Sequence, residues 1–167
     1  MTTSRDDLPA HPLPTEQLDL ATGDLRIAGL AWRGDALTRA ELAKLPRARF
    51  DGDFACEEGW RVEGLVWEGV ALREVVALCV PLPAARWVRI GAGPYSYEMS
   101  LDHLDRALLC DTLNGAPLTP EHGAPWRLVI ADGACFTSVK WVSALSFTAE
   151  PGEATAERIA RARIGQG

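Results

Sequence analysis

Residues 114–141 read NGAPLTPEHGAPWRLVIADGACFTSVKW, and three short patterns follow one another within this stretch. The patterns are Asn-Gly-x-Pro-Leu from Asn114, His-Gly-x-Pro-Trp-Arg from His122, and Ser-Val-Lys-Trp from Ser138. Asn-Gly predicts a tight turn whatever the function, because both residue types tolerate positive φ. Any one pattern alone is weak evidence, whereas three in a fixed order form a specific signal.

The same stretch carries two cations, Arg127 and Lys140, which lie 13 residues apart. Cations grouped with hydroxyl and N–H donors are what the binding of a phosphate requires. Each cation taken alone would also fit a solvated charge at the end of a strand. Their spacing therefore gains meaning only together with the motifs around them.

Cys56 lies upstream, in the segment FACEEGW that spans residues 54–60. A deprotonated thiolate suits a soft metal, so Cys56 is a candidate ligand. The alternative is a buried thiol in a strand, which is the usual state of a free cysteine. Together with the cationic stretch downstream, Cys56 favours a soft metal centre with an anionic cofactor.

The other cysteines and the histidines give little support to a structural zinc site. The four cysteines show no Cys-x-x-Cys pair, and the chain has three histidines. Cys79 and Cys110 each end an apolar stretch and are predicted to be small core residues.

Composition indicates an ordinary globular protein. Hydrophobic residues make up 47% and charged residues 24% of the 167 residues, a length that fits one domain. The net charge of −6 argues against a nucleic-acid partner. We find no apolar run of the roughly 18 residues that a membrane helix needs, and no hydrophobic signal segment. The chain as given is therefore expected to be cytoplasmic.

Local patterns divide the chain into a Pro-rich extended arm (1–23), a folded region (24–150) and a tail or short helix (151–167). Alternating apolar runs predict strands at 25–30, 49–56, 61–67, 86–90, 95–99, 126–131 and 142–148. Helical spacing and capping patterns predict short helices at 38–45, 70–78 and 100–108. Strands and short helices without strict alternation indicate the α+β class.

In order and spacing, Cys56 and the three downstream patterns resemble the molybdopterin-binding domain of the sulfite oxidase family, over roughly residues 24–149. The resemblance implies that 24–150 is this domain, with mixed sheets and short helices. It implies a molybdopterin-dependent oxidoreductase that transfers an oxygen atom to or from a small substrate at a mononuclear molybdenum centre. An external electron-transfer protein or redox subunit is then implied as well, since the sequence shows no haem or flavin motif.

The resemblance also assigns roles to single residues. Cys56 is expected to bind the metal and to be essential for catalysis. Arg127, Ser138 and Lys140 are expected to anchor the phosphate tail of the pterin. His122 is expected to hold the middle portion of the cofactor through its imidazole.

Three further residues fall at positions that the family uses. His11 stands in the arm where the family has an Arg-Asn-His-like cluster, and is expected to contact the cofactor. Arg61 and Tyr95 are expected to line the substrate pocket as catalytic residues. The pair 57–58 places two glutamates beside Cys56, which disfavours a dianion such as sulfite.

Departures from the family pattern leave a second function open. Between the two cations the chain has Cys135 and Phe136 where the family has a glycine-containing loop. Residues 93–95 read Gly-Pro-Tyr in place of Asp-Gly-Tyr, which removes a carboxylate facing the cofactor. The alternative is a non-catalytic domain of the same fold that binds or carries the cofactor.

A third function, from another class, is a cysteine hydrolase that uses Cys56, His122 and Asp102. It would require a nucleophile and a base within hydrogen-bond reach. The local sequence provides no support for that geometry.

Overall fold

The computed structural model describes residues 22–55, 61–131 and 138–152. Within these ranges the strands form two five-stranded sheets, joined by a few short helices. The α+β architecture with mixed sheets that the sequence indicates is confirmed. No helix in the described ranges is both long enough and apolar enough to cross a membrane.

The first sheet has the strand order β2-β1-β10-β5-β6. Its strands are β1 (Leu25–Gly29), β2 (Ala36–Leu37), β5 (Trp87–Ala92), β6 (Tyr95–Ser100) and β10 (Ala144–Thr148). β1 and β10 run parallel, with Arg26 in register with Ala144, and the other neighbours are antiparallel. A strand from the end of the described region therefore lies in the middle of this sheet.

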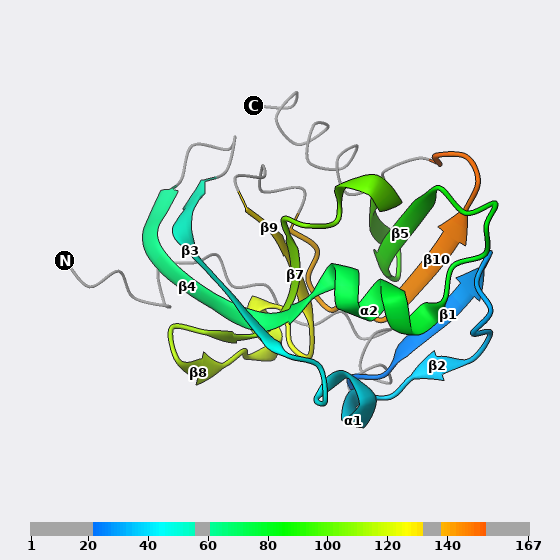
Figure 1. Cartoon of the computed structure of the whole chain (residues 1–167). Helices are drawn as coiled ribbons and strands as arrows, with labels where there is room; N and C mark the ends of the chain where they lie inside the picture. Colours follow the sequence, from blue (N-terminus) through cyan, green and yellow to red (C-terminus); the bar gives the residue numbers. More distant parts are fainter. Residues whose placement is uncertain (1–21, 56–60, 132–137, 153–167) are drawn as a thin grey trace.

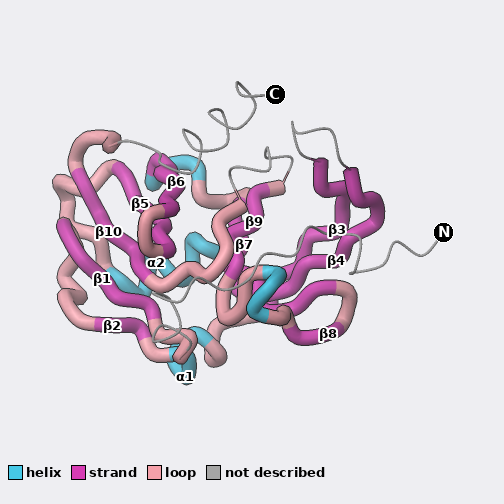
Figure 2. The backbone as a smooth tube through the Cα atoms, turned by 180° about the vertical axis from the view of Figure 1, so that it is seen from behind, coloured by secondary structure: helices cyan, strands magenta, loops and turns pink. Residues whose placement is uncertain are grey.

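The second sheet has the order β3-β4-β7-β8, with β9 paired to β7. Its strands are β3 (Arg47–Ala55), β4 (Arg61–Ala71), β7 (Ala107–Leu113), β8 (Ala116–Pro117) and β9 (Arg127–Ile130). Figures 1 and 2 show β3, β4 and β8 on one side of the molecule, the first sheet on the other, and β7 and β9 between them.

β4 runs four residues beyond its predicted end at Trp67, and the pairing with β7 shifts register between Glu68 and Gly69. A Cβ at Gly69 would lie only 1.9 Å from the carbonyl oxygen of Leu109. The close approach of the two backbones at this bulge therefore requires glycine.

Two of the three predicted helices are present. The helix α1 (Arg39–Leu42) is shorter than predicted, and α2 (Leu72–Cys79) begins two residues later because Val70 still belongs to β4. α2 buries one apolar face against the sheets, and Cys79 at its end is fully buried. The prediction that Cys79 and Cys110 are core residues is confirmed, and burial raises the pKa of the Cys79 thiol to about 12.

The helix predicted at residues 100–108 is wrong. Ser100 does cap a turn by accepting a hydrogen bond from the Asp102 backbone N–H (3.2 Å), but only the 3₁₀ helix η3 (Leu101–His103) follows. From Ala107 the chain forms β7, which pairs with both β4 and β9. A short apolar run fits a buried central strand as well as a helix, so its periodicity does not separate the two.

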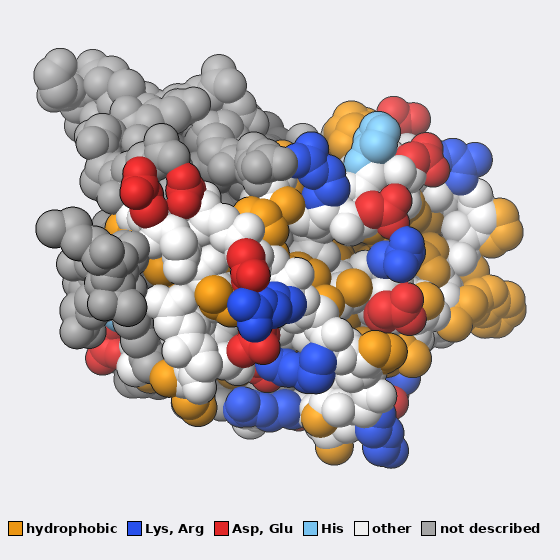
Figure 3. Space-filling view, turned by 60° about the vertical axis from the view of Figure 1, so that its left-hand side comes forward, with side chains coloured by type: hydrophobic (Ala, Val, Ile, Leu, Met, Phe, Trp, Pro, Cys, Tyr) orange, Lys and Arg blue, Asp and Glu red, His pale blue; other side chains and the backbone are white. Residues whose placement is uncertain are grey.

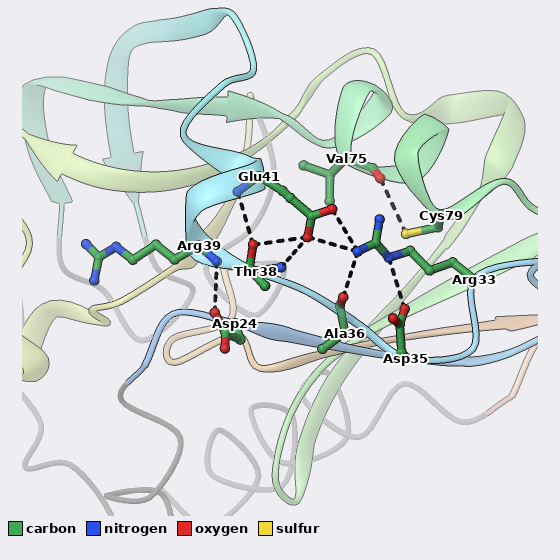
Figure 4. A network of polar contacts seen from close by, with 9 residues as sticks. All are labelled: Asp24, Arg33, Asp35, Ala36, Thr38, Arg39, Glu41, Val75 and Cys79. Carbon is green, nitrogen blue, oxygen red and sulfur yellow. Dashed lines mark hydrogen bonds and ion pairs between the residues drawn. The ribbon is translucent and has the colours of Figure 1, made fainter.

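A polar network fixes α1 beside the loop that follows β1 (Figure 4). The Nη2 atom of Arg33 lies 2.8 Å from both carboxylate oxygens of Glu41 and donates to the Ala36 carbonyl, while its Nε donates to Asp35. Glu41 also accepts from the Thr38 backbone N–H (2.8 Å), and the Thr38 hydroxyl accepts from the Glu41 N–H. The capping box predicted for this helix is therefore present.

The core consists of two clusters. The larger one joins the first sheet, α2 and strands β4, β7 and β9 of the second sheet, and the smaller one lies on the second sheet alone. The smaller cluster contains Val62, Leu65, Trp67, Cys110, Leu113, Leu118 and Val129. Its position matters for function, because Trp67 reaches from it to Arg127 at the start of β9.

Candidate functional site

Within residues 114–141, the segment 123–128 and the segment 139–141 lie side by side at the start of β9. The Leu128 N–H donates to the Val139 carbonyl (2.9 Å), and the Trp141 N–H donates to the Gly123 carbonyl (3.1 Å). The 3₁₀ helix η4 (Pro120–His122) precedes this pairing. The patterns that begin at residues 122 and 138 therefore form one continuous site.

Arg127 is the buried centre of this site, with 5% of its surface exposed. Its Nε donates to the Ser138 hydroxyl (2.7 Å), and its Nη1 donates to the His122 carbonyl (3.1 Å). The guanidinium carbon lies 5.0 Å from the centroid of the Trp67 ring. Burial lowers the pKa of Arg127 to about 10, so the side chain still carries its charge at neutral pH.

Lys140 supplies a second cation beside the first. Its Nζ donates to the Glu121 carbonyl (2.9 Å) and lies 5.9 Å from the centroid of the Trp141 ring. Burial, and after it the positive charge of Arg127, lowers the pKa of Lys140 to about 7. Lys140 is therefore easier to deprotonate than an ordinary solvated lysine.

Gly123 separates the stems of the two cations. Its φ of +112° is in the region that favours glycine. A Cβ there would lie 3.1 Å from Cγ of Lys140 and 3.2 Å from Cβ of Arg127. Glycine is thus required both for the backbone conformation and for the close packing of the two side chains.

The buried His122 forms hydrogen bonds in the site through both its backbone carbonyl and its imidazole ring. Its carbonyl oxygen accepts from Arg127, and its Nδ1 shares a hydrogen bond of 3.1 Å with the Thr119 hydroxyl. Trp141 has a φ of +59°, a strained value for a bulky residue, and its indole N–H donates to the Pro120 carbonyl (2.6 Å). These bonds tie η4 to the segment that carries Lys140.

The structure thus brings together four of the residues proposed from the sequence: His122, Arg127, Ser138 and Lys140. Sequence reasoning missed Trp67, because it lies 60 residues from Arg127 and no local pattern marks it. It also missed the carbonyl groups of Glu121 and His122, since any residue type can supply a carbonyl.

The remaining proposed residues are placed as follows. Cys56 and His11 lie outside the described residues. Arg61 is the first residue of β4, paired with Ala55 of β3, and only its backbone is described. Tyr95 begins β6 in the other sheet, where its partly buried ring packs against the larger core cluster.

The side chains described at the start of β9 include two cations and a hydroxyl, which are groups able to bind an anion. Within residues 22–55, 61–131 and 138–152, no group of three or more His, Cys, Asp or Glu side chains is placed to hold a metal ion. For the hydrolase alternative, Asp102 lies in η3, exposed to solvent. On the face seen in Figure 3, charged side chains of both signs are interspersed.

Known proteins resemble this chain over most of its length. The family described as "Oxidoreductase molybdopterin binding domain" matches residues 11–156. "Uncharacterized oxidoreductase YuiH" of Bacillus subtilis is 30% identical over 135 residues, which cover 79% of this chain and 68% of that protein. "Nitrate reductase [NADPH]" of Fusarium oxysporum is 30% identical over 107 residues, which cover 56% of this chain and 12% of the reductase.

Among solved structures, the sulfane dehydrogenase SoxCD from Paracoccus pantotrophus superposes with a TM-score of 0.71. The sequences are 22% identical, and the match covers 80% of this chain and 40% of the other. The expected sulfite-oxidase-type fold is confirmed by this likeness. Because the chain spans well under half of the dehydrogenase and about an eighth of the fungal reductase, their whole-protein activities do not transfer to it.

Proposed function

Since this chain belongs to the oxidoreductase molybdopterin-binding domain family, we propose that it binds molybdopterin at the Arg127–Lys140 site and acts as a molybdenum-dependent oxidoreductase. The observation that carries the proposal is the convergence of two partly or fully buried cations at one place. Arg127 donates to the Ser138 hydroxyl and the His122 carbonyl, and Lys140 donates to the Glu121 carbonyl.

The donor set suits the anionic end of this cofactor. Burial is the main cause of the lowered pKa of Lys140, and electrostatic repulsion by the positive charge of Arg127 is the second. A phosphate or pyrophosphate group between them would offset the repulsion and accept charge-assisted hydrogen bonds. The residues present therefore fit the phosphate tail of molybdopterin.

In this proposal Arg127, Ser138 and Lys140 bind the tail, and His122 orients the middle portion. Cys56 binds the metal, Arg61 and Tyr95 line the substrate pocket, and His11 contacts the cofactor. The bound cofactor supplies the oxygen-atom transfer and redox chemistry, and the chain supplies binding and orientation. The substrate is a small molecule, and an external electron-transfer protein exchanges electrons with the site.

The test is to purify the full chain from cells with plentiful cofactor, then measure molybdenum by metal analysis and pterin by the fluorescence of its oxidised form. We expect both near one per chain, with turnover of a small S- or N-oxide. Occupancy without turnover would instead support a cofactor carrier. Protein that holds neither metal nor pterin would overturn both functions.

A further inference from the structure

Trp67 contacts Arg127 of the proposed Arg127–Lys140 anion site from the strand on the other side of β7. β4 carries Trp67 and β9 carries Arg127, and both strands pair with β7, where Leu113 faces Trp67 and Cys110 faces Arg127. Trp67 is fully buried, and its ring lies 5.0 Å from the Arg127 guanidinium carbon. An aromatic face attracts a cation, and the attraction is larger where water is excluded.

The Asn-Gly motif, which the proposed function leaves unused, fixes the strand beside Trp67. Asn114 and Gly115 have φ of +50° and +79°, the signs expected for the turn between β7 and β8. The Asn114 N–H donates to the Val66 carbonyl (2.8 Å), and its side-chain Oδ1 accepts from the Val66 N–H (2.8 Å). Asn114 thus holds both backbone groups of the residue that precedes Trp67.

Without these contacts the Arg127 guanidinium would have to be ordered at the moment of binding. Arginine has many rotamers, and ordering one such side chain costs affinity. The ring of Trp67 lies against the guanidinium, while Ser138 and the His122 carbonyl hold two of its nitrogens. The three contacts together define the orientation of the charged group.

We propose that Trp67 is a positioning residue for the anion site, and that Asn114 fixes the strand that carries it. The inference rests on the proposed function, because it concerns the affinity of that site for the cofactor anion. It gives Asn114 a role in the site although its described bonds go to the backbone of Val66.

The test uses the full chain without cofactor, with inorganic pyrophosphate as the probe and isothermal calorimetry as the measurement. Trp67→Leu is expected to weaken pyrophosphate binding by about 2- to 10-fold, the range for ordering one long side chain. Trp67→Phe keeps an aromatic face and is expected to stay within about 2-fold of wild type. Leu65→Ala is the matched control, because Leu65 is equally buried in the same cluster.

Two further variants separate positioning from general stability. In an Arg127→Gln background, Trp67→Leu is expected to cause no further loss of affinity, because the group it positions is absent. Asn114→Gly keeps the turn but removes Oδ1, and it is expected to weaken pyrophosphate binding. Asn114→Asp keeps the acceptor oxygen and is expected to bind pyrophosphate as the wild type does.

If Trp67→Leu does not fold, Trp67→Phe still tests the contact through NMR. The ring current of an indole shifts the Arg127 Nε–H resonance, so that resonance is expected to move in Trp67→Phe. An unmoved resonance overturns the inference, as does equal loss of affinity in Leu65→Ala and Trp67→Leu. If wild-type protein retains neither pyrophosphate nor cofactor, the proposed function fails and this inference with it. Wild-type binding that Trp67→Leu leaves unchanged overturns the inference alone.

Discussion

The ammonium group of Lys140 is partly buried beside the Arg127 guanidinium, and burial together with that charge lowers the pKa of Lys140 to about 7. Anion binding needs the protonated lysine, so above pH 7 the site must take up a proton to bind. Affinity for the cofactor or for pyrophosphate should therefore fall as pH rises above 7, by a factor approaching about 10 per pH unit.

Lys140→Arg is the control for that prediction, because arginine stays protonated throughout this range. Calorimetry from pH 6 to 9 should show the fall in wild type and a flatter profile in the variant. The ionisation of the anion itself also changes with pH, but it affects both proteins equally and cancels when their profiles are compared. Parallel profiles would show that Lys140 is not the titrating group.

Removal of either cation should weaken cofactor binding. Arg127→Ala and Lys140→Ala each lose a charge-assisted hydrogen bond, at a cost of about 1.5–3 kcal/mol, or roughly 10- to 150-fold in affinity. Cofactor occupancy after gel filtration measures the effect. Lys44→Ala, at an exposed lysine, should leave occupancy unchanged and stability within about 0.5 kcal/mol of wild type. Equal occupancy in all four proteins would contradict the site.

Gly123→Ala should disturb both cations at once. The change places a Cβ against the stems of Lys140 and Arg127 and forces alanine into a left-handed backbone, with an expected cost of about 1–3 kcal/mol. Chemical denaturation measures the stability and calorimetry the pyrophosphate affinity. Gly29→Ala also places a Cβ at positive φ, but in β1 of the first sheet, against the backbone of Phe147. It should lose stability, and the folded protein should keep its anion affinity.

Cys56→Ser should give a folded protein without redox activity, because oxygen suits a soft metal less well than sulfur. Cys79→Ser should act on stability alone, at about 1–3 kcal/mol, because it places a hydroxyl in an apolar site. Turnover and the Mo(V) paramagnetic spectrum measure the first effect, and thermal unfolding the second. An unchanged Mo(V) spectrum in Cys56→Ser would show that Cys56 is not a ligand of the metal.

The sequence predicts the local elements well where short-range bonds define them. The capping box at Thr38 and Glu41 needs only residues three apart, and the helix starts where it indicates. The cap at Ser100 is equally correct, yet the helix beyond it is absent. Pairing with β4 and β9 determines the conformation from Ala107 onward, and both partners are distant in sequence.

The candidate site likewise combines residues that a local motif identifies with residues that only distant strand pairing brings together. Arg127 and Lys140 belong to a motif and can be proposed from their spacing. Trp67 cannot, because its contact with Arg127 depends on two strands that pair with β7 from opposite sides. The lowered pKa of Lys140 is likewise a property of burial, which spacing alone does not provide.

The parallel pairing of β1 with β10 has a consequence for biosynthesis. β10 lies between β1 and the β5–β6 hairpin, so the first sheet has no continuous hydrogen bonding until Ala144–Thr148 has left the ribosome. Contacts this distant along the chain slow folding, because a long loop must close before they form. The segment that carries Lys140 directly precedes β10. In the proposed function, the Arg127–Lys140 site can therefore accept the cofactor only after this late segment has also left the ribosome.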